Sequence, residues 1–141
     1  MSASNSTETA ILNLFFTATT WTSIADDTAT SPLTNLYISL HNSDPGEAGT
    51  ATTNETAYTN YARVAVARTG SGWTVSGNSA TNAGAVTFPA CGVTGDTITN
   101  FGIVSTSSGA GTLYFSGTAS LTVSNGVTPE FAIGALSVTC D

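Results

Sequence analysis

Charged side chains are scarce in this 141-residue chain. Lys and Arg together number two, Asp and Glu number nine, and charged residues make up 8 % of the sequence, against about 25 % in typical globular domains. There is no lysine, and the two cations are Arg63 and Arg68. Proteins that bind nucleic acids or anionic membranes do so with clusters of Lys and Arg. With a formal net charge of −7, the sequence predicts neither nucleic acid nor membrane as a partner.

Cysteine and long apolar runs are also scarce. Cys91 and Cys140 are the only two cysteines, too few for a zinc site made of protein ligands alone. Residues 1–9 carry no positive side chain ahead of the apolar segment 10–16, which argues against a signal peptide, and that segment is too short to span a bilayer. We therefore expect free thiols. A Cys91–Cys140 disulfide stays open for a particle that lives outside the cell.

One segment near the N-terminus has a helical pattern. Ile11, Leu14 and Phe15 share one face at helical spacing. Residues 6–7 (Ser-Thr) offer an N-cap, and the Thr-rich residues that follow end the helix near residue 16. Trp21 comes directly afterwards. A single amphipathic helix of this kind is expected to pack on a sheet or on a neighbouring subunit.

The rest of the chain alternates short apolar segments with turn residues. In residues 36–41, Leu36, Ile38 and Leu40 face one way and Tyr37, Ser39 and His41 the other, which predicts a half-buried strand. A long loop is expected at residues 42–59. Further strands are expected at 61–68, 72–75, 85–88, 97–105, 111–116, 119–123, 129–133 and 136–140. This spacing predicts a mainly β, single-domain antiparallel β-sandwich or jelly roll over 33–141, with an N-terminal helical arm over 1–20.

Candidate catalytic and metal-binding groups are few. His41 is the only histidine, and Asp44 follows three residues later; together they could be a base and its orienter for a serine. No Gly-x-Ser-x-Gly elbow accompanies them, so a role for His41 in pinning the following loop is favoured. Neither Asp26-Asp27 nor Asp44 with Glu47 has the spacing of a calcium loop, and no carboxylate pair suits glycoside hydrolysis. We therefore expect no enzyme activity, metal or cofactor.

Arg63 and Arg68 lie five residues apart on one expected strand and so point to opposite faces. In one interpretation each forms a salt bridge with a nearby acid of the same chain. In the other, one of them bridges to a neighbouring subunit. The sequence leaves both open.

Several segments together resemble a known group of proteins. They are residues 36–41 (LYISLH), 44–49 (DPGEAG), 54–55 (NE), 58–66 (YTNYARVAV), 72–75 (GWTV) and 85–90 (AVTFPA). This combination resembles small tailed-phage virion proteins, whose genes are commonly labelled tail-fibre-like, and the resemblance covers most of the chain. It implies a structural protein of the virion, assembled in the host cytoplasm, without catalytic residues.

Within that group, the small size, the uncharged polar surface and the spare helix favour a capsid decoration (cement) protein. It would be a homo-oligomer that binds the major capsid protein or other virion proteins. The alternative is a tail-fibre, tail-tip or baseplate module that binds a host receptor, with Tyr58, Tyr61 or Trp73 stacking on sugars. A cell-wall hydrolase is disfavoured by the lone histidine. The candidate partner-contact residues are Ile11, Leu14, Phe15, Trp21, His41, Asp44, Tyr58, Tyr61, Arg63 and Arg68.

Overall fold

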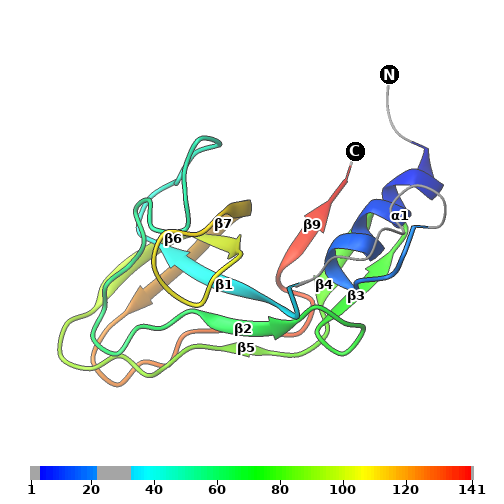
Figure 1. The fold of residues 1–141 in the computed structure, drawn as a ribbon. Coiled ribbons are helices and arrows are strands. Elements are labelled where there is room, and N and C mark those ends of the chain that lie inside the picture. The colour runs from blue at the N-terminus through cyan, green and yellow to red at the C-terminus, as the bar shows by residue number, and fades with distance from the viewer. Residues whose placement is uncertain (1–3, 22–32, 141) are drawn as a thin grey trace. The chain divides into compact units, whose positions relative to one another are not determined.

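The computed structural model describes residues 4–21 and 33–140. The acidic pair Asp26-Asp27 lies outside the described residues. The elements are α1 (Asn5–Phe16), β1 (Asn35–His41), β2 (Val64–Ala67), β3 (Trp73–Ser76), β4 (Ser79–Asn82), β5 (Val86–Thr87), β6 (Asp96–Val104), β7 (Leu113–Val123), β8 (Glu130–Phe131) and β9 (Ser137–Thr139) (Figure 1). The fold is mainly β with antiparallel sheets and one short N-terminal helix, which confirms the predicted fold class. No helix in the described part of the chain is long and apolar enough to cross a membrane.

The chain divides into two compact units. The first, called here the helix unit, comprises Met1–Asn35, Val66–Ala85 and Phe131–Asp141. The second, the sheet unit, comprises Leu36–Ala65 and Val86–Glu130. Each unit therefore joins segments that are distant in sequence. That the whole chain acts as one domain, with an arm over 1–20, stays a prediction.

The sheet unit is organised by a four-stranded sheet of order β2-β1-β6-β7. β1 pairs with β6 in antiparallel register, with Ile38 opposite Ile103 and Leu40 opposite Phe101. Burial extends to both faces of β1, because Ser39 and His41 are as inaccessible as Leu40. The prediction of a half-buried strand is therefore wrong. The polar face is covered by the long loop after β1, which returns to the strand through a bridge between His41 and Glu55.

The helix unit contains α1 and a three-stranded sheet of order β3-β4-β9. α1 ends at Phe16 as predicted, but its N-cap is Ser4, not residue 6 or 7. Its buried face is Glu8, Leu12 and Phe16, spaced four residues apart. The prediction placed Ile11, Leu14 and Phe15 on that face. The predicted face is wrong because the buried face includes a charged residue, Glu8, which the apolar pattern does not reveal.

Phe16 packs against Trp73 of β3, with ring centroids 4.5 Å apart. Trp73 pairs in turn with Asn82 on β4, a strand that the sequence does not predict. Its residues, Ser79–Asn82, lack the apolar alternation of a strand. They form one because Gly77, with φ of 60°, allows a tight turn that folds the polar segment back onto β3. A smaller difference concerns the strands expected at 111–116 and 119–123, which are one continuous strand, β7.

The chain leaves α1 through a turn with one left-handed residue. The N–H groups of Thr17 and Thr19 both donate to the carbonyl of Asn13, over 3.0 Å and 3.1 Å. The turn requires a left-handed residue, and that residue is Ala18, with φ of 53°. Glycine is the usual choice there, since a Cβ is strained in this conformation. The helix end therefore includes backbone strain at Ala18, which lowers the free energy of unfolding.

Replacing Ala18 by Gly should raise the stability of the protein. Relief of the left-handed strain, about 1–2 kcal/mol, outweighs the added entropy of the unfolded chain, about 0.4–1 kcal/mol. Ala10→Gly within α1 is the matched control and should lower stability by about 1 kcal/mol. Urea unfolding of both variants measures the two effects. Equal destabilisation by both would contradict the strain.

Candidate functional site: the polar cluster around His41 and Arg63

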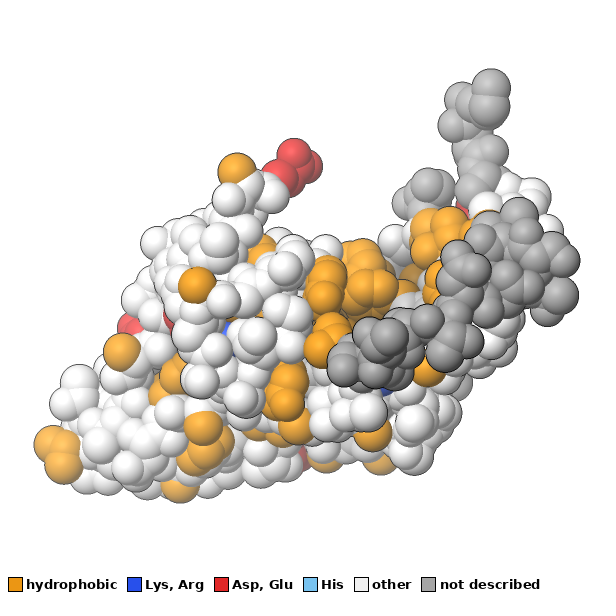
Figure 2. All heavy atoms as spheres, viewed as in Figure 1, with side chains coloured by type: hydrophobic (Ala, Val, Ile, Leu, Met, Phe, Trp, Pro, Cys, Tyr) orange, Lys and Arg blue, Asp and Glu red, His pale blue; other side chains and the backbone are white. Residues whose placement is uncertain are grey.

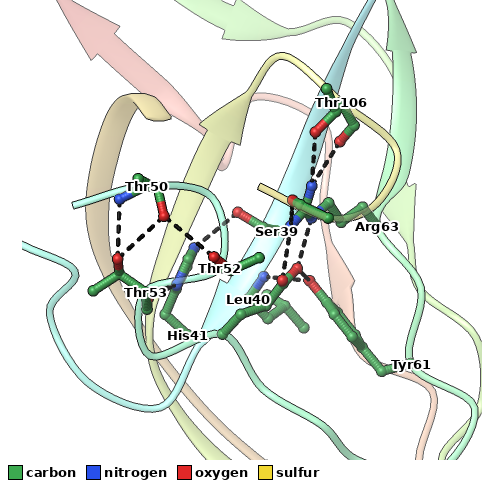
Figure 3. A network of polar contacts seen from close by, with 11 residues as sticks. Ser39, Leu40, His41, Thr50, Thr52, Thr53, Tyr61, Arg63 and Thr106 are labelled. Carbon is green, nitrogen blue, oxygen red and sulfur yellow. Dashed lines mark hydrogen bonds and ion pairs between the residues drawn. The ribbon is translucent and has the colours of Figure 1, made fainter. Parts of the chain in front are cut away.

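Five polar side chains of the sheet unit are joined by hydrogen bonds. Ser39 and His41 lie at the end of β1, Glu55 in the loop that follows, and Tyr61 and Arg63 just before β2. We call these five residues the His41–Arg63 cluster (Figure 3). Three separate chain segments meet there, so the cluster exists only in the folded protein.

His41 is fully buried, and its two ring nitrogens have partners. Nδ1 lies 2.8 Å from the carbonyl oxygen of Thr53. Because a carbonyl only accepts, Nδ1 carries the proton and donates. Nε2 of the neutral ring then accepts from the Ser39 hydroxyl, 2.8 Å away. His41 thus pins the loop after β1, the role that its position in the sequence favoured.

Burial lowers the pKa of His41 below its ordinary value of 6.5. The hydrogen bond to the Thr53 carbonyl and the nearby Glu55 carboxylate act in the opposite direction, and the Arg63 cation lowers the pKa further. The net direction is downward, because the desolvation of a charged imidazolium is the largest effect. The ring is therefore neutral near pH 7.

The Ser39–His41 pair has the hydrogen bond of an activated serine nucleophile. Both residues are nevertheless 0 % exposed. The backbone of Gly102 lies directly against them, since a Cβ at that position would be 2.6 Å from Ser39 Oγ and 2.9 Å from His41 Nε2. A substrate would have no room beside the serine. The predicted partner Asp44 is exposed and accepts instead from the N–H of Gly46 over 2.8 Å.

Arg63 is buried, and each of its five guanidinium N–H groups has an acceptor. Nε and Nη2 form a fork on Glu55, at 2.6 Å to Oε1 and 2.7 Å to Oε2. The remaining bonds run to the carbonyl and hydroxyl of Thr106 and to the carbonyl of Gly109. The hydrogen bonds to Glu55 raise the pKa of Arg63. Arg63 therefore joins the loop after β1 to the turn after β6.

Tyr61 completes the cluster. Its hydroxyl donates to Glu55 Oε1 over 2.9 Å and accepts from the N–H of Leu40 over 3.0 Å, and burial raises its pKa. Tyr58 is also buried, donates to the carbonyl of Pro89, and has its pKa raised to about 12, chiefly by burial. With Trp73 only 1 % exposed, the expectation that Tyr58 and Trp73 are open to sugars is wrong.

The second cation, Arg68, acts within the helix unit. It donates to the carbonyls of Leu14 and Phe15, which belong to the last turn of α1, and to that of Leu33. These helix carbonyls lack intrahelical partners and carry partial negative charge. The interpretation in which each arginine forms a salt bridge within the chain is therefore correct for Arg63. Arg68 instead donates its hydrogen bonds to backbone carbonyls. β2 lies between the two arginines and contains neither.

The predicted partner-contact residues are divided between the units. His41, Asp44, Tyr58, Tyr61 and Arg63 lie in the sheet unit, and Ile11, Leu14, Phe15, Trp21 and Arg68 in the helix unit. Of these, Ile11 and Asp44 are exposed; the others are buried or half-buried. A contact of any of them with a partner stays a prediction.

Neither the cysteines nor the acids form a further site in the described ranges. Cys91 is a buried free thiol and Cys140 a half-buried one. No three His, Cys, Asp or Glu side chains of residues 4–21 and 33–140 come together in a way that could hold a metal ion. Sequence reasoning missed Glu55 as the partner of Arg63, although an acid so near a rare cation was an available signal.

Replacing Arg63 by Met should cost about 3–5 kcal/mol of stability, because Glu55 would keep its partly buried charge without a partner. Arg68→Met is the matched control, since it removes the other cation but leaves only carbonyls unpaired. Its cost should be smaller, about 1–2 kcal/mol. Denaturant unfolding of Arg63→Met, Glu55→Gln and the double variant Glu55→Gln/Arg63→Met measures the coupling free energy between the two side chains. Strictly additive losses would show that the pair does not interact.

The protein should lose stability in mild acid through His41. The unfolded chain binds a proton at pH 6.5, whereas the folded protein resists protonation until a lower pH. The His41 contribution is therefore fully present above pH 6.5 and is lost as the pH falls from there toward the folded pKa. His41→Gln should flatten the slope of unfolding free energy between about pH 7.5 and 5.5. An unchanged slope would be inconsistent with a neutral, buried His41.

Comparison with known protein families finds a match over almost the whole chain. A family model described as Podophage GP4 fiber I protein gp80 matches residues 2–139. No curated protein matches the chain. The matched residues extend from the N-terminal helix through the last strand, in agreement with the resemblance to tailed-phage virion proteins. The chain therefore belongs to the family of Podophage GP4 fiber I protein gp80 and is a structural protein of the phage virion.

Proposed function

We propose that this protein is a non-enzymatic subunit of a tail fibre, acting by association with other virion proteins. The family description, which names a fiber protein, supports the tail over the capsid. The observation that carries the non-enzymatic part is the closure of the Ser39–His41 pair beneath Gly102. The pair serves to hold a loop.

The surface is suited to association. The face shown in Figure 2 consists mostly of uncharged polar side chains and backbone, with basic groups barely visible. Ser and Thr lose less rotamer entropy on burial than Lys or Glu, which lose up to about 2 kcal/mol each. A partner can therefore cover such a surface at comparatively low entropic cost. A partner that binds the folded protein but not the unfolded chain then stabilises the assembly.

Capsid decoration, the function favoured from the sequence, is the competing proposal. A surface with few charged side chains suits a head protein as well as a fibre protein, so location and number of copies are what distinguish the two proposals. A fibre subunit should be present in few copies, at the tail. A decoration protein should be present in many copies over the head, and its loss should lower the heat resistance of the particle.

Quantitative mass spectrometry of purified virions, combined with antibody labelling in electron microscopy, tests the proposal. We expect few copies per particle and label at the tail. Label over the whole head would establish the decoration function instead. Incubation of the wild-type protein and His41→Gln with peptidoglycan and capsular polysaccharide tests the non-enzymatic part. Turnover that disappears in the variant would overturn it.

A further inference from the structure

The chain contains one Asn-Gly pair, Asn125-Gly126, and both residues are exposed in the turn that follows β7. In such a pair the asparagine side chain loses its amide more readily than elsewhere, because glycine leaves the next backbone nitrogen unhindered. Asparagine is for this reason one of the heat-sensitive residues of proteins. The pair lies in the sheet unit but outside the His41–Arg63 cluster.

Residues 124–127 form a type II β-turn. The N–H of Val127 donates to the carbonyl of Ser124 over 2.9 Å, which closes the turn. Gly126 has a φ of 83°, whereas the φ of Asn125 is not positive. A positive φ at the third position alone is the mark of type II, in which ψ of the second residue is about +120°. The turn therefore fixes the direction of the bond from Asn125 to Gly126.

The same turn is bound to Cys91 through backbone groups of both segments. The N–H of Gly126 donates to the carbonyl of Cys91, and the N–H of Cys91 donates to the carbonyl of Val127, each over 2.8 Å. Cys91 is 3 % exposed, and its thiol donates to the carbonyl of Thr94 over 3.3 Å. Two of the hydrogen bonds that hold Cys91 thus depend on the backbone of the turn.

Loss of the Asn125 amide begins when the backbone nitrogen of Gly126 attacks Cγ of Asn125. A C–N bond closes a five-membered imide, and the side-chain nitrogen leaves as ammonia with the proton that the Gly126 nitrogen gives up. Water then opens either carbonyl of the imide. The product is an aspartate or, where the chain continues through Cβ, an isoaspartate.

The folded turn opposes the first step in two ways. Ring closure needs the Gly126 nitrogen to lie beside Cβ of Asn125 about the Cα–C bond, and a ψ of about +120° turns it well away. The proton that must leave is also engaged, since this N–H donates to the carbonyl of Cys91. The attack therefore requires the turn to open. A locally opened or unfolded chain has neither obstacle.

We propose that Asn125 is a latent modification site, protected while the turn 124–127 is closed and converted to aspartate or isoaspartate when it opens. Isoaspartate adds one atom to the main chain, so the turn no longer places its N–H and carbonyl groups against Cys91. The conversion makes a local opening irreversible and leaves the Cys91 thiol accessible. It does not depend on whether the protein lies in the tail or on the head.

Peptide mass spectrometry of the purified full chain, incubated at mildly alkaline pH, measures the conversion at Asn125. The chain unfolded in urea should convert about ten to a hundred times faster than the folded protein, because the hydrogen bonds of the turn must break before the attack. Val127→Pro removes the N–H that closes the turn and should convert faster than the wild type. Val127→Ala keeps that N–H and is the matched control. Circular dichroism checks that both variants are folded.

Thiol labelling in a Cys140→Ser background measures the effect on Cys91. Freshly prepared protein should react slowly, and aged protein should react faster in proportion to the isoaspartate that has formed. Asn125→Gln does not form the five-membered imide and should keep a slow thiol after the same ageing. Asn125→Asp carries the new charge without the extra main-chain atom, so its freshly prepared thiol should also stay slow.

Three results would contradict the proposal. One is equal conversion of Asn125 in the folded and the urea-unfolded chain, which would mean that the turn gives no protection. Another is a folded Val127→Pro that converts no faster than Val127→Ala. The third is aged, converted protein in which the Cys91 thiol remains as slow as in aged Asn125→Gln.

Discussion

The rest of the sheet unit depends on the buried pairing of Arg63 with Glu55. One guanidinium holds a carboxylate, a hydroxyl and two carbonyls that come from two separate chain segments. Burying such a charge is costly unless its hydrogen-bonding groups are satisfied, and here each N–H is. The long loop after β1 and the turn after β6 are irregular segments, which isolated β-bridges such as His41–Glu55 and Thr50–Thr112 join only at single points. The Arg63 fork gives them a common fixed point.

Three further polar side chains also form hydrogen bonds with backbone groups of irregular segments or of a helix end. His41 donates to the Thr53 carbonyl, and Arg68 donates to carbonyls of the last turn of α1. The Asn82 side chain donates to the Ala132 carbonyl and accepts from the N–H of Leu136, in the turn before β9. In each case one polar side chain supplies partners for backbone groups that would otherwise be buried without any. With charge so scarce, the available cations and amides are directed inward. The outer surface consists mostly of uncharged polar groups, with a few exposed acids such as Asp44, Glu47 and Glu130.

This arrangement, with the cations inside and mostly uncharged polar groups outside, is consistent with a structural protein of the virion. Inward-directed cations leave no basic patch to attract nucleic acid, and a nucleophile-like pair that is sealed under Gly102 acts as a clasp between β1 and its loop. An exterior with few charged side chains limits the charge that neighbouring subunits must bury when they pack together.

The sequence by itself determined the mainly β fold, the end of the helix at Phe16 and the strand at 36–41, because these depend on local pattern. The phage family came from the resemblance of several of its segments to known virion proteins. Tertiary structure alone decided which face of the helix is buried, since Glu8 interrupts the apolar period. It also decided that Ser79–Asn82 is a strand, because a polar segment becomes one only when a turn pairs it with β3. Above all it showed that His41, a candidate base, and Arg63, a candidate bridge between subunits, each hold segments of their own chain together. A side chain's chemistry is set by what covers it, and the covering segments lie far away in the sequence.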